Sequence, residues 1–373
     1  MSDETQDAND WKKEGGRFNA NDAEPVDPMP DDPLRTLWRT VGEWGADWLT
    51  KDPPPRRYLL TGADGKGVLP LGRVGMLASA GGQGKSWALC QLALCVAAGV
   101  DWLGTFKVAE GGYVLLALAE EEAEEMRRRL FYGAKALGLD DEKLALVAER
   151  IVALPLCGES VALTYSPEEA RGFNAPPGTI LETTFASRLR AKLHDAEHEW
   201  RLIVLDPISR FAGPDVEGDN AAATRFVQVL EKLTQAPGHP TLLVAHHTSK
   251  AARREGGADA SAARGASGLT DAVRWQANLM PVKDAPDFVK FEVTKSNYAK
   301  FPPRLVLRRQ EHGELRRATK PDIDAMKDQI AAAKAERDQA GEGKQGAKAK
   351  AEKPKRDGRA AAAGFDAAED AGL

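Results

Sequence analysis

The sequence has little of what marks secreted and membrane proteins. No apolar run approaches the roughly 20 residues that span a bilayer, and the first residues are acidic and polar, unlike a signal peptide. From these absences we expect a soluble, cytoplasmic protein with no membrane partner. A length of 373 residues suffices for one large core with appendages, or for two domains.

Cysteine is also scarce, and the chain carries no excess of positive charge. Cys90, Cys95 and Cys157 are the three cysteines, and they form neither a C-x-x-C pair nor an obvious disulfide framework. Cys90 and Cys95 lie in an apolar segment, so we expect buried thiols in a reducing compartment. With a formal net charge of -5, the whole chain does not have the charge typical of nucleic-acid-binding proteins. Any such binding must use local basic surfaces.

The most informative motif is a glycine-rich turn between an apolar strand and an apolar helix. The turn reads SAGGQGKS from Ser79 to Ser86, and the apolar segment 87–98 follows it. This is the layout of a P-loop, in which N–H groups at a helix N-terminus, a lysine and a hydroxyl bind a triphosphate with Mg²⁺. We therefore predict that ATP and Mg²⁺ bind here. The residues expected to bind the nucleotide are Ala80, Gly81, Gly82, Gln83, Gly84, Lys85, Ser86 and Trp87.

This motif departs from the usual pattern at one position. Ser79 stands first in GxxxxGK[ST], where glycine is usual, but serine is small enough for the turn. Lys85 would supply positive charge to the phosphates, and Ser86 would supply the hydroxyl for Mg²⁺. The alternative is a glycine-rich turn before an ordinary core helix.

The chain divides by composition into an acidic N-terminus that we expect to be disordered, a short helix with its linker, an α/β core, and a charged tail. Apolar residues at near-helical spacing over Leu34–Leu49 predict an amphipathic helix, which packs either on its own core or on a neighbouring subunit. The tail should be helical from about Asp322 and of low complexity from Gly341. The four regions are residues 1–32, 33–52, 53–320 and 321–373.

Within the core, short apolar runs alternate with helical stretches from Gly72 to about Pro281. This alternation predicts an α/β fold with a mostly parallel central sheet. Pro155 should end the third strand, because proline cannot donate to a sheet ladder. Strands are expected at 74–78, 113–118, 151–154, 202–205 and 242–245, and helices at 85–98, 121–137, 183–199 and 221–233.

Carboxylates follow two of these strands, at the sheet edge where such folds bind ligands. Asp206 ends an apolar strand and is predicted to bind Mg²⁺, unless it only caps the turn before Pro207. Glu120 ends another strand and could orient or deprotonate the attacking water. Alternatively, Glu120 is one of several solvated carboxylates at a helix start, where the helix dipole favours them.

Two histidines and a basic loop follow the strand at 242–245. A polar side chain at this strand end could touch the γ-phosphate and relay its loss to the loop, whereas the pair His246–His247 could instead bind a metal. The loop is predicted to grip the phosphates of a nucleic acid strand, unless it is a solvated segment with no partner. Its basic residues are Lys250, Arg253, Arg254 and Arg264.

Taken in order, these segments resemble the RepA-type plasmid replicative helicases, within the RecA-like ring ATPases. The resemblance covers about residues 53–309 and implies a RecA-like P-loop NTPase core in a hexameric, ATP-driven motor that encircles single-stranded DNA. The segments that carry it are SAGGQGKS, VLLALAEEEAEEMRRRL, RLIVLDPISRF, LLVAHHTSK, ARGASGLTDAVRW and VTKSNYAKF.

The resemblance also implies a role for each site residue. Two further residues, Arg129 and Lys295, match recurrent basic positions to which we assign no role. The implied roles are phosphate-binding lysine for Lys85, Mg²⁺-binding hydroxyl for Ser86, catalytic glutamate for Glu120, Walker B aspartate for Asp206, γ-phosphate sensor for His247, and arginine finger toward a neighbouring subunit for Arg274.

The leading hypothesis is an ATP-hydrolysing DNA helicase that moves on single-stranded DNA in plasmid or phage replication. The N-terminal extension and the C-terminal tail lie outside the resemblance, and the tail either contacts DNA, an initiator or a primase, or is an inert solvated segment. One alternative is a RecA-like ATPase that loads or remodels DNA without unwinding it. Another is a nucleotide-gated DNA-binding assembly module that hydrolyses ATP poorly.

Overall fold

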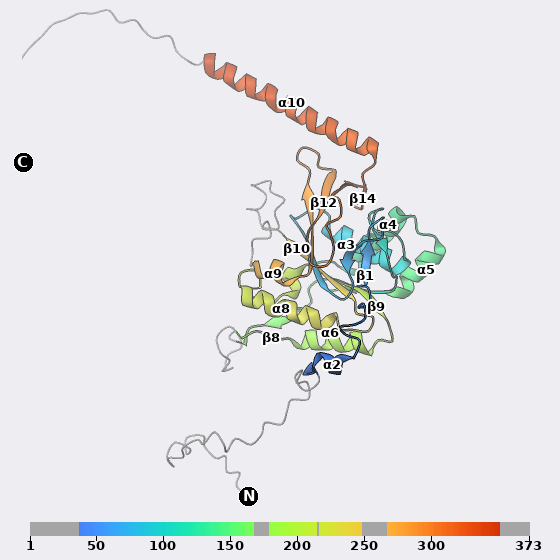
Figure 1. Ribbon diagram of the computed structural model, residues 1–373. Coiled ribbons are helices and arrows are strands. Elements are labelled where there is room, and N and C mark those ends of the chain that lie inside the picture. Colours follow the sequence, from blue (N-terminus) through green and yellow to red (C-terminus); the bar gives the residue numbers. More distant parts are fainter. Residues whose placement is uncertain (1–36, 168–178, 215, 248–266, 351–373) are drawn as a thin grey trace, which may run out of the picture. The chain divides into compact units, whose positions relative to one another are not determined.

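The computed structural model describes residues 37–167, 179–214, 216–247 and 267–350, and Figure 1 shows their helices and strands. The chain forms two compact units, residues 1–56 and 57–373, which we describe separately. None of the described helices is both long enough and apolar enough to cross a membrane.

The described part of the first unit contains one short helix, α2 (Val41–Trp44). The prediction of a helix over Leu34–Leu49 was therefore wrong in its extent from Trp38 onward, and residues 34–36 lie outside the described part of the chain. Thr40 caps α2 through its hydroxyl, which accepts from the N–H of Glu43, and Gly45 ends the helix with a φ of 152°. The large apolar side chains of this segment are exposed, namely those of Leu37, Trp38, Val41, Trp44, Trp48 and Leu49.

The second unit is built on a nine-stranded sheet in the order β14-β13-β12-β11-β3-β10-β9-β5-β6. Neighbouring strands are parallel from β11 to β6 and antiparallel from β11 to β14. The predicted α/β class with a mostly parallel sheet is thus confirmed. The strands are β3 (Val74–Ser79), β5 (Tyr113–Leu118), β6 (Ile151–Pro155), β9 (Trp200–Asp206), β10 (Thr241–His247), β11 (Trp275–Pro281), β12 (Phe288–Ser296), β13 (Leu305–Arg309) and β14 (Leu315–Arg317).

Helices cover both faces of this sheet, because its central strands carry apolar side chains on both sides. In β5, Leu116 packs into the core on the side of α3, whereas Leu115 packs into the core on the side of α6 and α8. The helix α3 is buried nearly all round, between the sheet and the outer helices α4 and α5. The helices are α3 (Lys85–Ala98), α4 (Ala123–Leu137), α5 (Asp141–Arg150), α6 (Thr184–Asp195), α7 (Ile208–Phe211), α8 (Asn220–Leu233) and α9 (Ser267–Ala272).

Two smaller sheets complete the second unit. The first joins β2 (Gly67–Pro70), β1 (Tyr58–Thr61) and β4 (Lys107–Val108), and the second joins β7 (Thr164–Tyr165) to β8 (Leu181–Glu182).

Two local predictions can be compared with the structure. Cys90 and Cys95 are buried as predicted, and burial raises the pKa of the Cys90 thiol to about 12. The third strand ends at Pro155, as predicted, and the proline is the last residue of β6. Among the described strands, β6 is an edge strand that pairs with β5. The N–H of Leu156 donates to the carbonyl of Leu118, so the lack of an N–H on Pro155 removes no hydrogen bond between the two strands.

The antiparallel strands lead into a long C-terminal helix, α10 (Lys320–Lys350), which Figure 1 shows at the end of the sheet after β14. It continues through Gly341, where the sequence turns to low complexity. Met326 and Ile330 of α10 pack on the cluster around Phe288 of β12, so the start of the helix is held on the antiparallel part of the sheet.

Candidate active site

The glycine-rich turn joins β3 to α3 in the form that the sequence predicts. Gly82 and Gly84 have φ angles of 75° and 89°, a left-handed conformation that glycine adopts without strain. Gly84 caps α3 and, having no side chain, makes no side-chain bond to the first N–H groups of this helix. Those donors and the positive end of the helix dipole are therefore available to an anion.

Ser79, the irregular first residue of the motif, needs no glycine-like backbone because it is the last residue of β3. Its side chain is buried, and its hydroxyl donates to the carbonyl of Ala80 over 2.8 Å. The serine thus satisfies its own polar group within the turn.

Lys85 and His247 meet at the carboxyl ends of the parallel strands. The register aligns His247 of β10 with Ser79 of β3, and Nζ of Lys85 lies 3.2 Å from Nδ1 of His247. Burial lowers the pKa of Lys85, against the charges of Asp206 and Glu120, which raise it. Burial and the lysine charge lower the pKa of His247. An ammonium can only donate, so in a hydrogen bond with protonated Lys85 the Nδ1 atom of His247 is the acceptor.

Asp206 lies at the same edge, as the last residue of β9. The carboxylate is buried, and burial raises its pKa, while a hydrogen bond from Ser86 and the charge of Lys85 lower it. Its Oδ2 atom has no hydrogen-bond partner, which is unusual for a buried carboxylate oxygen. A buried, unpaired oxygen beside a hydroxyl fits a Mg²⁺ site made by Asp206 and Ser86.

Glu120 follows β5 and is exposed at this edge of the sheet. Its charge acts on Lys85, Asp206 and His247, so the structure brings these four side chains to one place. Oε1 of Glu120 lies 3.4 Å from Nε of Arg210, a residue of α7 that the sequence did not identify. The pair is exposed and weak, which leaves the carboxylate free to turn toward a bound water.

His246 precedes His247 in β10, and successive side chains of a strand point to opposite faces. It is buried, its Nδ1 has no hydrogen-bond partner, and this atom is 3.8 Å from Oε1 of Glu217. Burial, together with the neighbouring His247 and Lys85, lowers its pKa to about 4. The described residues contain no group of three or more His, Cys, Asp or Glu side chains placed to hold a metal ion.

Arg274 is not brought to the P-loop of its own chain. Its N–H donates to the carbonyl of Val74, the first residue of β3, whereas the P-loop follows the last residue of that strand. The two ends of β3 are roughly 16 Å apart at about 3.3 Å per residue. Lys295 lies near Arg274 and donates to the carbonyls of Thr270 and Asp271 at the end of α9. The backbone of Arg274 therefore lies at the opposite end of β3 from the P-loop.

Arg129 of α4 lies beside the start of α3. Its guanidinium is 2.5 Å from Oε1 of Glu121 and 5.6 Å from the centre of the Trp87 ring. Burial raises the pKa of Glu121, while the charge of Arg129 lowers it. Arg129 thus fixes the acidic segment after β5 against the first turn of α3.

One contact with the P-loop has no counterpart in the sequence-based predictions. Arg309, at the end of β13, donates to the carbonyl of Gly82. The two residues are 227 positions apart, and no local pattern connects them. Lys250, Arg253, Arg254 and Arg264, the predicted nucleic-acid contacts, lie outside the described residues.

The chain matches a known protein family and is similar to a solved structure. Residues 36–253 match the family described as AAA domain, which is more than half of the chain. A solved structure described as an ATPase domain has 12% sequence identity and a TM-score of 0.45, and the match covers 66% of this chain and 85% of that one.

Proposed function

The chain belongs to the AAA domain family. We propose that it is an ATP-dependent DNA helicase that assembles into a ring and moves along single-stranded DNA. The observation that carries the proposal is the meeting of Lys85, Glu120, Asp206 and His247 beside a P-loop at one edge of the sheet. The family match supports the ATPase activity. The DNA and replication roles rest on the ordered motifs of the sequence.

In this proposal, the N–H groups of the P-loop and the ammonium of Lys85 bind the phosphates of ATP. Mg²⁺, when bound, is held by the Ser86 hydroxyl and the Asp206 carboxylate, and it neutralises phosphate charge. Glu120 orients a water and takes its proton as the water oxygen attacks the γ-phosphorus. The bond from that phosphorus to the bridging oxygen breaks, and ADP leaves with the oxygen.

Two further residues couple this step to neighbouring parts of the assembly. Arg274 of an adjacent subunit stabilises the developing charge, since its backbone lies at the opposite end of β3 from the P-loop of its own chain. The hydrogen bond between Lys85 and His247 breaks when the γ-phosphate binds and forms again when the γ-phosphate leaves. His247 directly precedes the basic segment that we propose contacts DNA.

Three measurements on the purified full chain test the proposal. We expect Mg²⁺-dependent ATP hydrolysis that rises with single-stranded DNA, displacement of a strand from a forked duplex, and a larger particle when an ATP analogue and Mg²⁺ are added. DNA-stimulated hydrolysis without strand displacement would favour a loading or remodelling ATPase. Absence of ATP hydrolysis would sink the proposal.

A further inference from the structure

The hairpin of β13 and β14 reaches the P-loop from outside the predicted site. Nη2 of Arg309 lies 3.0 Å from the carbonyl oxygen of Gly82. A Cβ added at Gly84 would come within 3.3 Å of Leu315 Cδ1 and within 3.6 Å of Arg309 Nη1. Two independent contacts therefore place the hairpin against the loop.

The hydrogen bond from Arg309 fixes the direction of a neighbouring amide. The peptide between Gly82 and Gln83 is planar and trans, so its carbonyl and its N–H point in opposite directions. Since the Gly82 carbonyl turns toward Arg309, the Gln83 N–H turns away from the hairpin. In a P-loop, the N–H groups that point to the inside of the loop are those that hold the phosphates.

This peptide needs an external restraint. Gly81 and Gly82 precede it, and glycine has access to many backbone conformations, so the peptide can rotate at little cost when nothing holds its carbonyl. An arginine is suited to the task because its guanidinium is rigid and permanently charged, which gives a stronger hydrogen bond to a carbonyl than a neutral donor gives.

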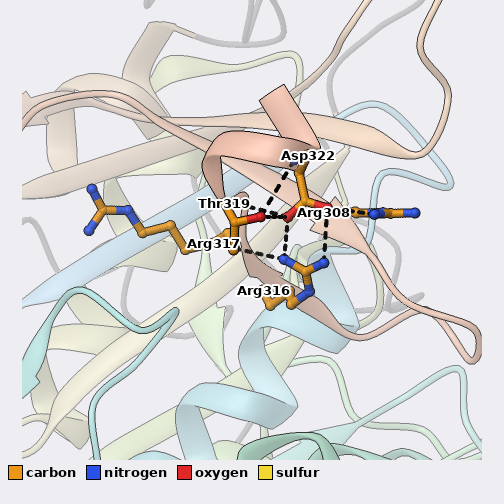
Figure 2. A network of polar contacts seen from close by, with 5 residues as sticks. All are labelled: Arg308, Arg316, Arg317, Thr319 and Asp322. Carbon is orange, nitrogen blue, oxygen red and sulfur yellow. Dashed lines mark hydrogen bonds and ion pairs between the residues drawn. The ribbon is translucent and has the colours of Figure 1, made fainter. Parts of the chain in front are cut away.

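The hairpin itself is held on two sides. Gln91 of α3 exchanges two hydrogen bonds with the backbone of Leu315, at 2.9 and 3.0 Å. On the opposite face, Asp322 of α10 binds the guanidinium groups of Arg308 and Arg316, each at 2.5 Å, as Figure 2 shows. Alternate residues of a strand face opposite sides, so Asp322 anchors one face while Arg309 and Leu315 meet the P-loop and α3 on the other.

We propose that Arg309 is a positioning residue for the nucleotide phosphates: by holding the Gly82 carbonyl, it keeps the Gln83 N–H aimed into the P-loop. This inference rests on the proposed function, in which ATP binds at the P-loop. The inference predicts how the affinities for ATP and ADP depend on Arg309. The N–H groups of a P-loop serve the α- and β-phosphates, so ADP and ATP depend on Arg309 equally.

The test measures the affinity of the full chain for ATP and ADP by calorimetric titration with Mg²⁺. Arg309→Ala should weaken both nucleotides about tenfold and by the same factor, which is the effect of losing one charged hydrogen bond. Inorganic tripolyphosphate, used as a competitor, should lose affinity by that factor as well. Arg309→Lys, which keeps a charged donor, should recover part of the loss.

Arg317→Ala is the matched control, because it removes the same charge from the same hairpin. Figure 2 shows the Arg317 side chain pointing away from the cluster around Asp322. We expect its affinities for ATP and ADP to stay within about twofold of the unaltered protein. Circular dichroism and the unfolding temperature verify folding, and if Arg309→Ala does not fold, Arg309→Gln takes its place with the same expectation.

Three outcomes overturn the inference. The first is unchanged affinity for both nucleotides in a folded Arg309 variant. The second is a loss for ATP that clearly exceeds the loss for ADP, which would make Arg309 a γ-phosphate ligand. The third is an unchanged affinity for tripolyphosphate, which would place Arg309 at the base or ribose. Failure of the unaltered protein to bind ATP would instead overturn the proposed function, and the inference with it.

Discussion

The ammonium of Lys85 lies 3.2 Å from Nδ1 of His247, and this contact joins the first residue of α3 to the last residue of β10. Burial lowers the pKa of both groups, and a hydrogen bond joins them. A phosphate oxygen is a stronger partner for an ammonium than a neutral imidazole is. We therefore expect the ammonium of Lys85 to leave His247 and bind a phosphate oxygen when a triphosphate binds.

Replacement of Lys85 should abolish ATP turnover. Lys85→Ala removes the buried positive charge at the P-loop, and we expect kcat/KM for ATP to fall at least about 100-fold, a loss of roughly 3 kcal/mol of transition-state stabilisation. Steady-state ATPase measurements with single-stranded DNA check this. Lys107→Ala, at an exposed lysine of β4, is the control and should retain full activity. Normal turnover by Lys85→Ala would refute the assigned site.

Glu120→Gln separates the catalytic role of Glu120 from its alternative as a solvated carboxylate at a helix start. If Glu120 takes the proton of the attacking water, kcat should fall by about 100-fold or more while ATP binding persists. Single-turnover hydrolysis together with nucleotide titration measures both quantities. Glu124→Gln changes an exposed carboxylate of the same acidic segment and should leave kcat unchanged. Equal activity of the two variants would show that Glu120 is not the base.

His246 gives a prediction for stability as a function of pH. Its pKa is about 4 in the folded protein and about 6.5 when unfolded. Below pH 6.5 the unfolded chain binds the proton more readily, so the stability that His246 contributes is full above this pH and declines as the pH falls toward 4. The decline reaches about 3 kcal/mol by linkage. The charged or titratable groups around it are Lys85, His247 and Glu217.

Urea unfolding at pH 7, 6, 5 and 4 tests this prediction. His246→Phe removes the buried titratable ring, so the loss of unfolding free energy between pH 7 and pH 4 should be smaller by about 3 kcal/mol than in the unaltered protein. His194→Phe makes the same change at an exposed site of α6 and should keep the original pH dependence. Parallel curves for all three proteins would contradict the buried, uncharged state of His246.

The sequence was sufficient for the local part of the site. The strand, the turn and α3 were predicted together because each carries its own signal, and α3 has the predicted bounds Lys85–Ala98. The positions of Glu120, Asp206 and His247 at one sheet edge follow from the rule that parallel strands place their carboxyl ends together.

The contacts made by the hairpin could not be predicted in this way. The pairs Arg309–Gly82 and Gln91–Leu315 join residues more than 200 positions apart, and they depend on how β13 and β14 pair beyond β12. The helix predicted over Leu34–Leu49 is the reverse case, because there the local pattern was present but tertiary packing did not support it. Its spacing is helical, but most helical stability comes from tertiary packing, and here its large apolar side chains are exposed.

We expect the carboxylate of Asp322 to anchor the start of α10 on the sheet. The carboxylate accepts from Arg308, Arg316 and Thr319, and the bond from Arg316 contributes most to holding its pKa far below the usual range. Asp322→Ala would leave two guanidinium groups without their partner. We expect a lower unfolding temperature and faster trypsin cleavage within α10, whereas Asp328→Ala, at an exposed position of the same helix, should change neither.

The sign of the pH effect follows from the lowered pKa of Asp322. Because the folded carboxyl keeps its charge at a pH where the unfolded one is protonated, its contribution is full at neutral pH and is lost as the pH falls below about 4. The difference in unfolding temperature between the unaltered protein and Asp322→Ala should therefore narrow in acid. A constant difference from pH 7 to pH 3 would show that the charge of Asp322 is not what anchors α10.

Arg274 and Lys85 provide a test of a site shared between subunits. Each single variant, Arg274→Ala or Lys85→Ala, should be inactive, because every active site lacks one of the two groups. In a mixture of the two proteins, some interfaces pair an intact Lys85 with an intact Arg274 of the neighbour, so part of the ATPase activity should return. The activity should depend on the mixing ratio and be greatest near equal amounts. If mass measurements detect mixed assemblies that remain inactive, Arg274 does not act across the interface.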